Sequence, residues 1–175
     1  MSTLRYTCPC CGQEHEGLPD LAHSWPDCWD AAAAAREPHR NRLDSDTCVV
    51  DGEHFFIRCV LRAPIRGADA ALGWGVRLSQ SGANFRAYIE SFGASLERET
   101  FGYFSNRLPS HPDTMGLRAL ARWRGDRQRP LVGLEPVEHP LARDWRDGIP
   151  QERAVEFAVP VLHREAAERS SPRAH

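Results

Sequence analysis

The clearest structural pattern in this chain lies in residues 47–58, which run Thr47-Cys48-Val49-Val50-Asp51-Gly52-Glu53-His54-Phe55-Phe56-Ile57-Arg58. Both halves of the stretch are rich in β-branched and aromatic residues, which favour extended strands. The dipeptide Asp51-Gly52 between them is typical of a tight hairpin turn. The stretch therefore predicts a β-hairpin whose second strand extends to Leu61.

The next segments change from a strand period to a helix period. Residues 72–79 alternate, with Leu72, Trp74, Val76 and Leu78 on one face and Gly73, Gly75, Arg77 and Ser79 on the other. Over residues 82–97 the apolar side chains recur at helical spacing, at Phe85, Tyr88, Ile89, Phe92 and Leu96. From these two patterns we expect a core built on Phe55, Ile57, Trp74, Val76, Phe85, Ile89 and Phe92.

The rest of the chain predicts further strands and helices in an α+β arrangement. Strands are expected at 101–108, 117–124 and 130–135, and helices at 27–37, 139–147 and 150–168, with a kink or an early end at Pro160. Runs of strands with helices before, between and after them favour an antiparallel sheet of about five strands packed with helices. We expect a cysteine knuckle at 1–20, an α+β domain at 21–168 and a disordered tail at 169–175.

Composition limits the environment and the partners. The chain has 175 residues and a net charge of −2, so no global field favours nucleic acid or an anionic membrane. Its start has no apolar signal segment, and no apolar run approaches the roughly 18 residues of a membrane span. We expect a cytoplasmic protein with no membrane partner and no nucleic acid, and a protein partner is compatible with these features. The arginine-rich run 118–129 is interpreted as a solvated sheet face.

Cysteines near the start point to a metal. Cys8 and Cys11, followed by Gly12, have the spacing of half a zinc-ribbon site, in which two thiolates share one tetrahedral ion. In a reducing compartment such cysteines bind metal or act as a redox pair more often than they form disulfides. His15 offers a nearby nitrogen donor. The other donors that could complete the site are Cys10, His23, Cys28, Cys48, His54 and Cys59, of which Cys48 and Cys59 also suit buried strand positions.

Several segments together resemble an uncharacterised bacterial family that is filed as a domain of unknown function. The resemblance is carried by residues 6–19 (Tyr6-Thr7-Cys8-Pro9-Cys10-Cys11-Gly12 to Gly17-Leu18-Pro19), by residues 46–58, and by later short blocks such as Trp74-Gly75-Val76 and His139-Pro140-Leu141-Ala142. It covers about residues 5–163. The family pattern implies a cysteine at the Cys48 position, and so favours zinc held by Cys8, Cys11, His15 and Cys48.

Catalytic patterns are weak. The chain has no Gly-x-Ser-x-Gly, Walker, dinucleotide or His-Glu-x-x-His motif. Ser110, His111 and Asp113 are adjacent in a Pro-rich loop, and adjacency is no evidence for a triad. We therefore expect a non-catalytic binding or interaction protein with a structural zinc knuckle. The alternatives are an enzyme that uses His54, Arg58 and perhaps the metal, and a thiol redox module at Cys8 and Cys11.

Overall fold

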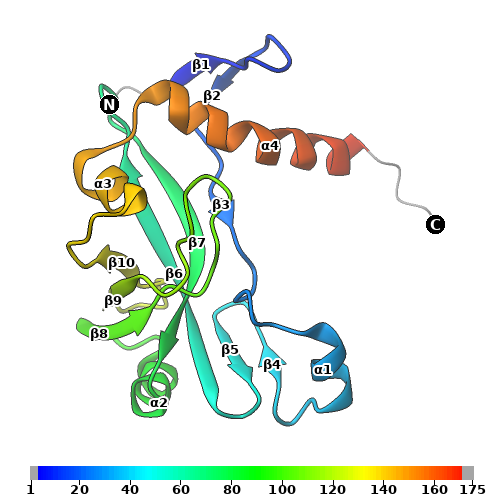
Figure 1. Ribbon diagram of the computed structural model, residues 1–175, viewed down its shortest axis with the longest axis vertical. Coiled ribbons are helices and arrows are strands. Elements are labelled where there is room, and N and C mark those ends of the chain that lie inside the picture. Colours follow the sequence, from blue (N-terminus) through cyan, green and yellow to red (C-terminus); the bar gives the residue numbers. More distant parts are fainter. Residues whose placement is uncertain (1–3, 171–175) are drawn as a thin grey trace.

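The structure, a computed structural model, describes residues 4–170 and confirms an α+β fold (Figure 1). Its strands are β1 (Arg5–Thr7), β2 (Glu14–Glu16), β3 (Leu21–Ala22), β4 (Arg42–Leu43), β5 (Thr47–Val50), β6 (His54–Pro64), β7 (Ala71–Gln80), β8 (Arg98–Tyr103), β9 (Arg118–Trp123) and β10 (Leu131–Leu134). Its helices are α1 (Ala31–Arg36), α2 (Gly82–Ser91), α3 (Pro140–Asp147) and α4 (Gln151–Ser170). The tail expected from residue 169 begins inside α4, and residues 171–175 lie outside the described part.

The sheet differs from the expected five antiparallel strands. It has eight strands in the order β3-β7-β6-β10-β9-β8, with β5 beside β6 and β4 beside β5, while β1 and β2 form a separate hairpin. It is also mixed, because β3 pairs in parallel with β7 and β10 pairs in parallel with β6. The prediction was wrong here because β3 and β4 have two residues each. Strands this short are fixed by their neighbours and not by a pattern of their own.

The expected hairpin of β5 and β6 is confirmed, and its turn has positive φ angles at Asp51 and Gly52. The long strands β6 and β7 then pair antiparallel from Phe55–Gln80 to Pro64–Ala71 and form the centre of the sheet. The predicted apolar face of β7 is fully buried. Its other face is covered as well, since Arg77 on that face is 0% exposed.

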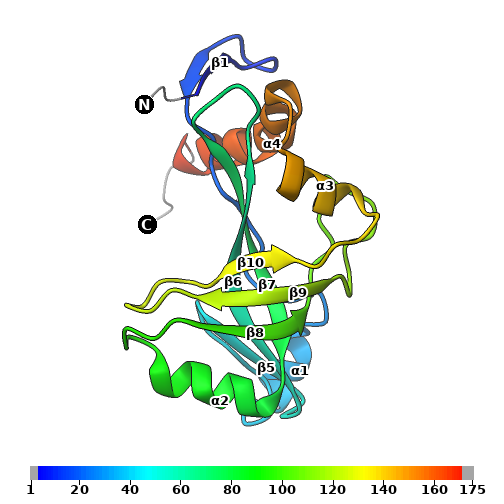
Figure 2. The ribbon, with the colours of Figure 1, turned by 90° about the vertical axis from the view of Figure 1, so that its left-hand side faces the viewer.

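The sheet divides on one side of β6. The first half of β6 pairs with β5, whereas β10 joins further along, opposite Val60 (Figure 2). Between the two, Arg129 Nε donates to Asp46 Oδ1 at 2.7 Å. This ion pair joins the segment before β5 to the segment before β10.

Helix α2 is shorter than the apolar stripe predicts. It ends at Ser91, because Phe92 has extended backbone angles and Gly93 follows with φ of 99°. Phe85 and Tyr88 are buried, whereas Ile89, Phe92 and Leu96 are 51%, 41% and 42% exposed. Ile89 and Phe92 were therefore wrongly assigned to the core, in which the other predicted residues are buried or, for Phe55, half-buried.

A kink or an early end was expected at Pro160; helix α4 continues through this residue, so the early end is wrong. Pro160 has no N–H, so the carbonyl oxygen of Glu156 loses its usual helical donor. Both residues are exposed. Water can therefore satisfy that oxygen, which lowers the cost of a proline inside a helix. Within residues 4–170 none of the helices combines the length and the apolar character that crossing a membrane requires.

Candidate metal centre

The N-terminal hairpin presents the cysteine turn. Strands β1 and β2 pair with Tyr6 opposite His15, and the residues between them form the predicted knuckle. The backbone N–H of Gly12 donates to the Cys8 carbonyl oxygen at 2.9 Å, and Gly12 has φ of 67°. Glycine adopts this left-handed conformation without a steric penalty. The turn thus brings Cys11 back over Cys8.

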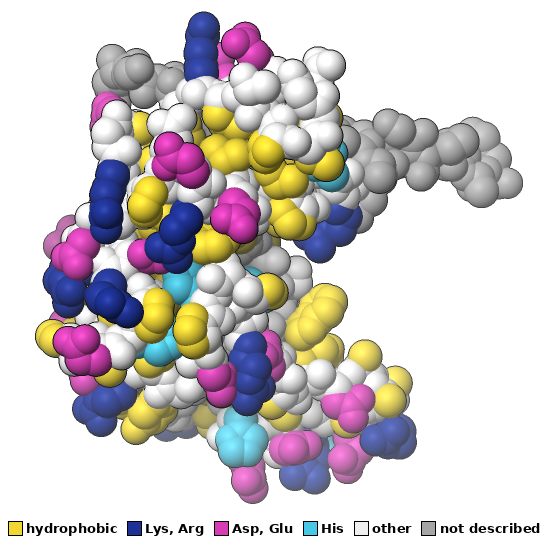
Figure 3. Space-filling model, turned by 45° about the horizontal axis from the view of Figure 1, so that its top comes forward, with side chains coloured by type: hydrophobic (Ala, Val, Ile, Leu, Met, Phe, Trp, Pro, Cys, Tyr) yellow, Lys and Arg dark blue, Asp and Glu magenta, His cyan; other side chains and the backbone are white. Residues whose placement is uncertain are grey.

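This hairpin packs against α4. Leu4, Tyr6 and Cys8 belong to the same buried cluster as Ala154 and Ala158 of the helix. Both ribbon views place β1 beside α4, at the end of the molecule opposite α2 (Figures 1 and 2). Figure 3 shows hydrophobic side chains gathered over this end, with charged side chains around them. The packing sets the side chains of α4 against the cysteine turn.

His163 of α4 completes a cluster of three metal-ligating side chains. Its Nε2 lies 3.3 Å from the Cys8 Sγ. The ligand atoms of Cys8, Cys11 and His163 all lie within 4.8 Å of one another. Cys8 is buried, Cys11 is exposed and His163 is half-buried, so the cluster lies at the surface end of the hairpin–helix interface.

His15 lies next to Cys11, outside the group of three whose ligand atoms are all within 4.8 Å of one another. Its Nε2 lies 3.6 Å from the Cys11 Sγ, and its ring stacks on Tyr6 with ring centroids 5.6 Å apart. For a tetrahedral zinc with Zn–S of about 2.3 Å and Zn–N of about 2.0–2.1 Å, neighbouring sulfur and nitrogen ligands lie roughly 3.6 Å apart. Both sulfur–nitrogen distances in this cluster are close to that separation.

The chemistry of Cys8 suits a metal ligand. The hydrogen bond with His163, helped by the backbone N–H of Cys11, lowers the pKa of the Cys8 thiol to about 6, although burial alone would raise this pKa. The thiolate is the form that binds metals and reacts with electrophiles. At neutral pH the cluster therefore offers a sulfur anion beside an imidazole.

Cys48 lies elsewhere. It is fully buried on β5 in a small cluster with Val50 and Phe56, and β5 lies at the opposite end of the molecule from β1 and β2 (Figure 1). Burial raises the pKa of the Cys48 thiol to about 12, which keeps this thiol protonated. The structure therefore places Cys8 beside Cys11 and His15 beside Cys11, but His15 is not in the group of ligand atoms within 4.8 Å of one another, and Cys48 lies far from all three. Cys59 is buried on β6, as its alternative interpretation predicted, and Cys10 and Cys28 are exposed.

Sequence reasoning missed His163, although the helix pattern contains a hint of it. Val155, Val159 and His163 recur every four residues, which places them on one side of a helix. Val155 is buried and Val159 is half-buried. A histidine that continues an apolar stripe near the end of a helix is a candidate ligand for any site that the stripe faces.

A second constellation appears around His111. Its Nδ1 lies 2.8 Å from Ser110 Oγ, and its Nε2 lies 2.9 Å from Oδ2 of Asp144 in α3. The carboxylate that completes this chain is therefore Asp144 and not Asp113. The His111 side chain is 0% exposed and packs against Trp74 and Phe157, and Asp144 also accepts two hydrogen bonds from Arg153.

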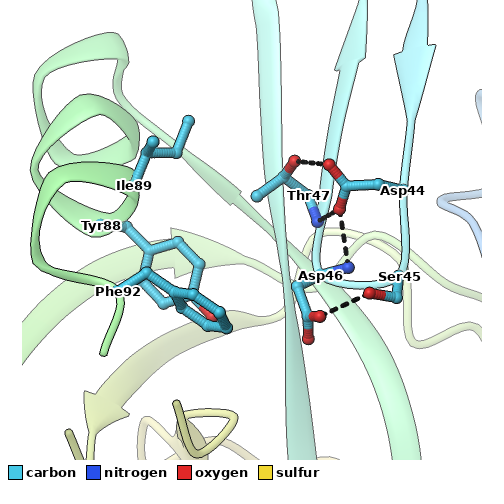
Figure 4. A pocket seen from close by; sticks show the side chains of 7 residues that line it. All are labelled: Asp44, Ser45, Asp46, Thr47, Tyr88, Ile89 and Phe92. Atoms are coloured by element: carbon cyan, nitrogen blue, oxygen red, sulfur yellow. Dashed lines mark hydrogen bonds between the residues drawn. The ribbon is translucent and has the colours of Figure 1, made fainter. Parts of the chain in front are cut away.

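A pocket of about 350 Å³ lies between the loop before β5 and helix α2 (Figure 4). One wall is the loop Asp44–Thr47, in which the Asp44 carboxylate accepts hydrogen bonds from Thr47 N and Thr47 Oγ1. The other wall is Tyr88, Ile89 and Phe92. The pocket thus pairs a polar wall with a mainly apolar one.

The comparisons with known proteins concern the family alone. No curated protein and no solved structure matches this chain. A family model described as "Uncharacterized protein conserved in bacteria (DUF2199)" matches residues 7–149, a range that contains Cys8, Cys11 and His15 and ends before His163. Since this match spans most of the chain, the protein belongs to that uncharacterised bacterial family.

Proposed function

We propose that this chain is a non-catalytic binding protein whose N-terminal hairpin and last helix are held together by a structural zinc ion. The observation that carries the proposal is the meeting of Cys8, Cys11 and His163 within 4.8 Å, with His15 3.6 Å from Cys11. Two thiolates and two imidazoles form one of the usual closed donor sets for structural zinc. Such a site has no open position for a substrate, which favours a structural role.

The metal test compares variants of the proposed ligands with a control cysteine from the same turn. Protein purified without chelator or nickel should contain one zinc per chain by elemental analysis. Cys8→Ser and His163→Ala should reduce this content and lower the melting temperature, since metal binding contributes to folding. Cys10→Ser changes an exposed cysteine of the same turn, and should keep both. Metal-free wild-type protein whose melting temperature is the same with and without added zinc would contradict the proposal.

The binding role is supported by the pocket at the other end of the molecule. Ile89 and Phe92 line it next to each other and are 51% and 41% exposed, so the pocket presents an apolar surface that a ligand could cover. The acceptor oxygens of the Asp44–Thr47 loop face them. We propose a ligand group with an apolar body and a hydrogen-bond donor. In a titration followed by NMR, phenethylamine should bind more tightly than phenylpropionate. Ile89→Asp should weaken the binding of phenethylamine. Equal binding of the two probes would contradict this ligand class.

One observation favours a second function, hydrolysis through Ser110. When His111 Nε2–H donates to Asp144, its Nδ1 is free to accept the Ser110 proton. Ser110 Oγ could then form an acyl bond while His111 passes the proton to the leaving group. Labelling by a fluorophosphonate probe that is lost in Ser110→Ala would support this activity. Absence of labelling would contradict hydrolysis. The hydrogen-bond chain would then serve only to join the 108–114 loop to α3 and α4.

A further inference from the structure

The two sulfur atoms of the candidate metal centre differ in their access to solvent. Cys11 is exposed, whereas Cys8 is buried in the cluster that contains Ala154 and Ala158 of α4. Their Sγ atoms belong to the group of ligand atoms that lie within 4.8 Å of one another. A small reagent from solvent can therefore reach the Cys11 sulfur directly, and the Cys8 sulfur lies close behind it.

The turn between the two cysteines suits a disulfide as well as a shared ion. The backbone N–H of Gly12 donates to the Cys8 carbonyl oxygen at 2.9 Å, so residues 8–12 form one tight turn. In such a turn, Cα atoms three residues apart lie within about 7 Å of each other. A disulfide spans about 4.4–6.8 Å between its two Cα atoms. Rotation of the two side chains can therefore join Cys8 to Cys11 while β1 and β2 stay paired.

The remaining cysteines differ from this pair. Cys48 and Cys59 are 0% exposed on strands β5 and β6, so a reagent in solvent does not reach them. Cys10 is exposed in the same turn, but its sulfur is outside the group of ligand atoms within 4.8 Å. Cys28 is exposed in the segment before α1. The chain therefore contains one exposed thiol that has a second sulfur behind it, and a separate exposed thiol for comparison.

We propose that Cys11 and Cys8 form an oxidation site for small hydroperoxides, and that oxidation removes both sulfur ligands of the metal centre; the second part rests on the proposed function. The Cys11 thiolate attacks one oxygen of the hydroperoxide, the O–O bond breaks, and the sulfur becomes a sulfenic acid while the departing oxygen takes a proton from water. The Cys8 thiolate then attacks the Cys11 sulfur, so that the S–S bond forms, the S–O bond breaks and hydroxide leaves. The two sulfurs together lose two electrons, which reduce the hydroperoxide to an alcohol or to water.

Disulfide formation changes the donor set of the metal centre. Metals bind cysteine as the thiolate, a form that the disulfide no longer offers. The nitrogen donors that remain are His163 of α4 and His15 of β2, and soft thiolates no longer accompany them. Oxidation therefore releases zinc and removes its link between the hairpin and α4. A dithiol reductant restores both thiols by thiol–disulfide exchange, so the change is reversible.

The test treats the zinc-loaded full chain with an equal molar amount of hydrogen peroxide. Mass spectrometry of the unreduced protein should show the loss of two hydrogen atoms as the disulfide forms. A chromophoric chelator should detect zinc release over the same time course, and dithiothreitol should reverse both changes. Cys10→Ser, which removes the third thiol of the turn, should behave as the wild type. Cys28 should remain a free thiol during this time, although it is exposed too.

Matched variants and the metal-free chain complete the test. Cys11→Ser changes an exposed side chain and should lose the disulfide, whereas Cys28→Ser should keep it. A disulfide that still forms in Cys11→Ser, or oxidation of Cys28 as fast as that of the pair, would overturn the oxidation site. A disulfide that forms while zinc stays bound would overturn the proposed release.

The outcomes also separate this inference from the proposed zinc. Zinc-loaded protein that keeps its thiols reduced in peroxide would overturn the oxidation site and leave the structural zinc intact. Disulfide formation in a chain that binds no zinc would contradict the structural zinc and support the oxidation site, because the two sulfurs react without the ion.

Discussion

The Cys8 sulfur and the His163 Nε2 lie 3.3 Å apart although 155 residues separate them in the chain. Closing such a long loop costs conformational entropy that grows with loop length. Packing of the hairpin against α4 supplies part of the compensation, and a shared zinc ion would supply more. Because of this contact, a metal bound to both residues would link the N-terminal hairpin to the last helix, whereas a local knuckle would stabilise only its own turn.

Zinc affinity tests whether both histidines of the proposed site are ligands. Zinc-finger sites bind with roughly 10–16 kcal/mol over four ligands, or about 3 kcal/mol for each ligand. His15→Ala and His163→Ala should each weaken zinc binding about a hundredfold in a competition assay with a chromophoric chelator. His39→Ala alters an exposed histidine outside the cluster and serves as the control. If His15→Ala binds zinc as tightly as the wild type, the fourth ligand is not His15.

Stability should fall in mild acid because of His111. Burial is the main cause of the lowered pKa of His111 in the folded protein, and the Asp144 bond opposes that shift only in part. The unfolded chain then binds a proton more readily than the folded chain below the ordinary pKa of 6.5. The contribution of this histidine is complete above pH 6.5 and is lost as pH falls. Urea unfolding at pH 7.5 and 5.5 should show a smaller loss for His111→Gln than for wild type, with His39→Gln as the control.

Backbone packing at Gly102 predicts a strong steric effect. A Cβ at this β8 position would collide with the carbonyl oxygen of Ser79 and approach Gln80 Nε2 to 2.7 Å. Gly102→Ala should therefore cost about 1–3 kcal/mol of unfolding free energy, the usual range for overpacking. Gly133→Ala on β10 meets only the guanidinium of Arg122, which is exposed and can move. Denaturant unfolding should place the second variant within about 1 kcal/mol of the wild type.

Local pattern predicted the parts of the fold that carry their own periodicity. The hairpin of β5 and β6, the buried face of β7 and the start of α2 all follow from alternation, turn residues or helical spacing. The arginines of β9 lie on an exposed face as predicted, with Arg118 paired to Glu135 and Arg122 to Glu99. These features depend on residues that are close together in the sequence, so they can be predicted from the sequence alone.

Long-range contacts could not be predicted in the same way. Cys48 was a reasonable ligand by residue type, but strand pairing directs it into a small core at the far end of the sheet. His163 reaches the cysteines only because α4 lies across the N-terminal hairpin, and Asp144 reaches His111 because α3 packs near the 108–114 loop. In each case the docking of a separate element selects the partner, and spacing along the chain does not.

Hydrogen exchange can show whether zinc stabilises the interface and not merely its own ligands. Hairpin β1–β2 has two three-residue strands and contributes few buried side chains of its own, so it should open locally in metal-free protein. Zinc at a hundredfold excess over its dissociation constant stabilises the bound form by about 2.7 kcal/mol, or about a hundredfold in protection. Amides of residues 5–16 and of α4 near Ala158 should both gain this protection, because the ion joins them. Amides of β6 and β7 exchange through global opening and should change together with overall stability. Protection confined to residues 8–12 would indicate a local knuckle without the contact to His163.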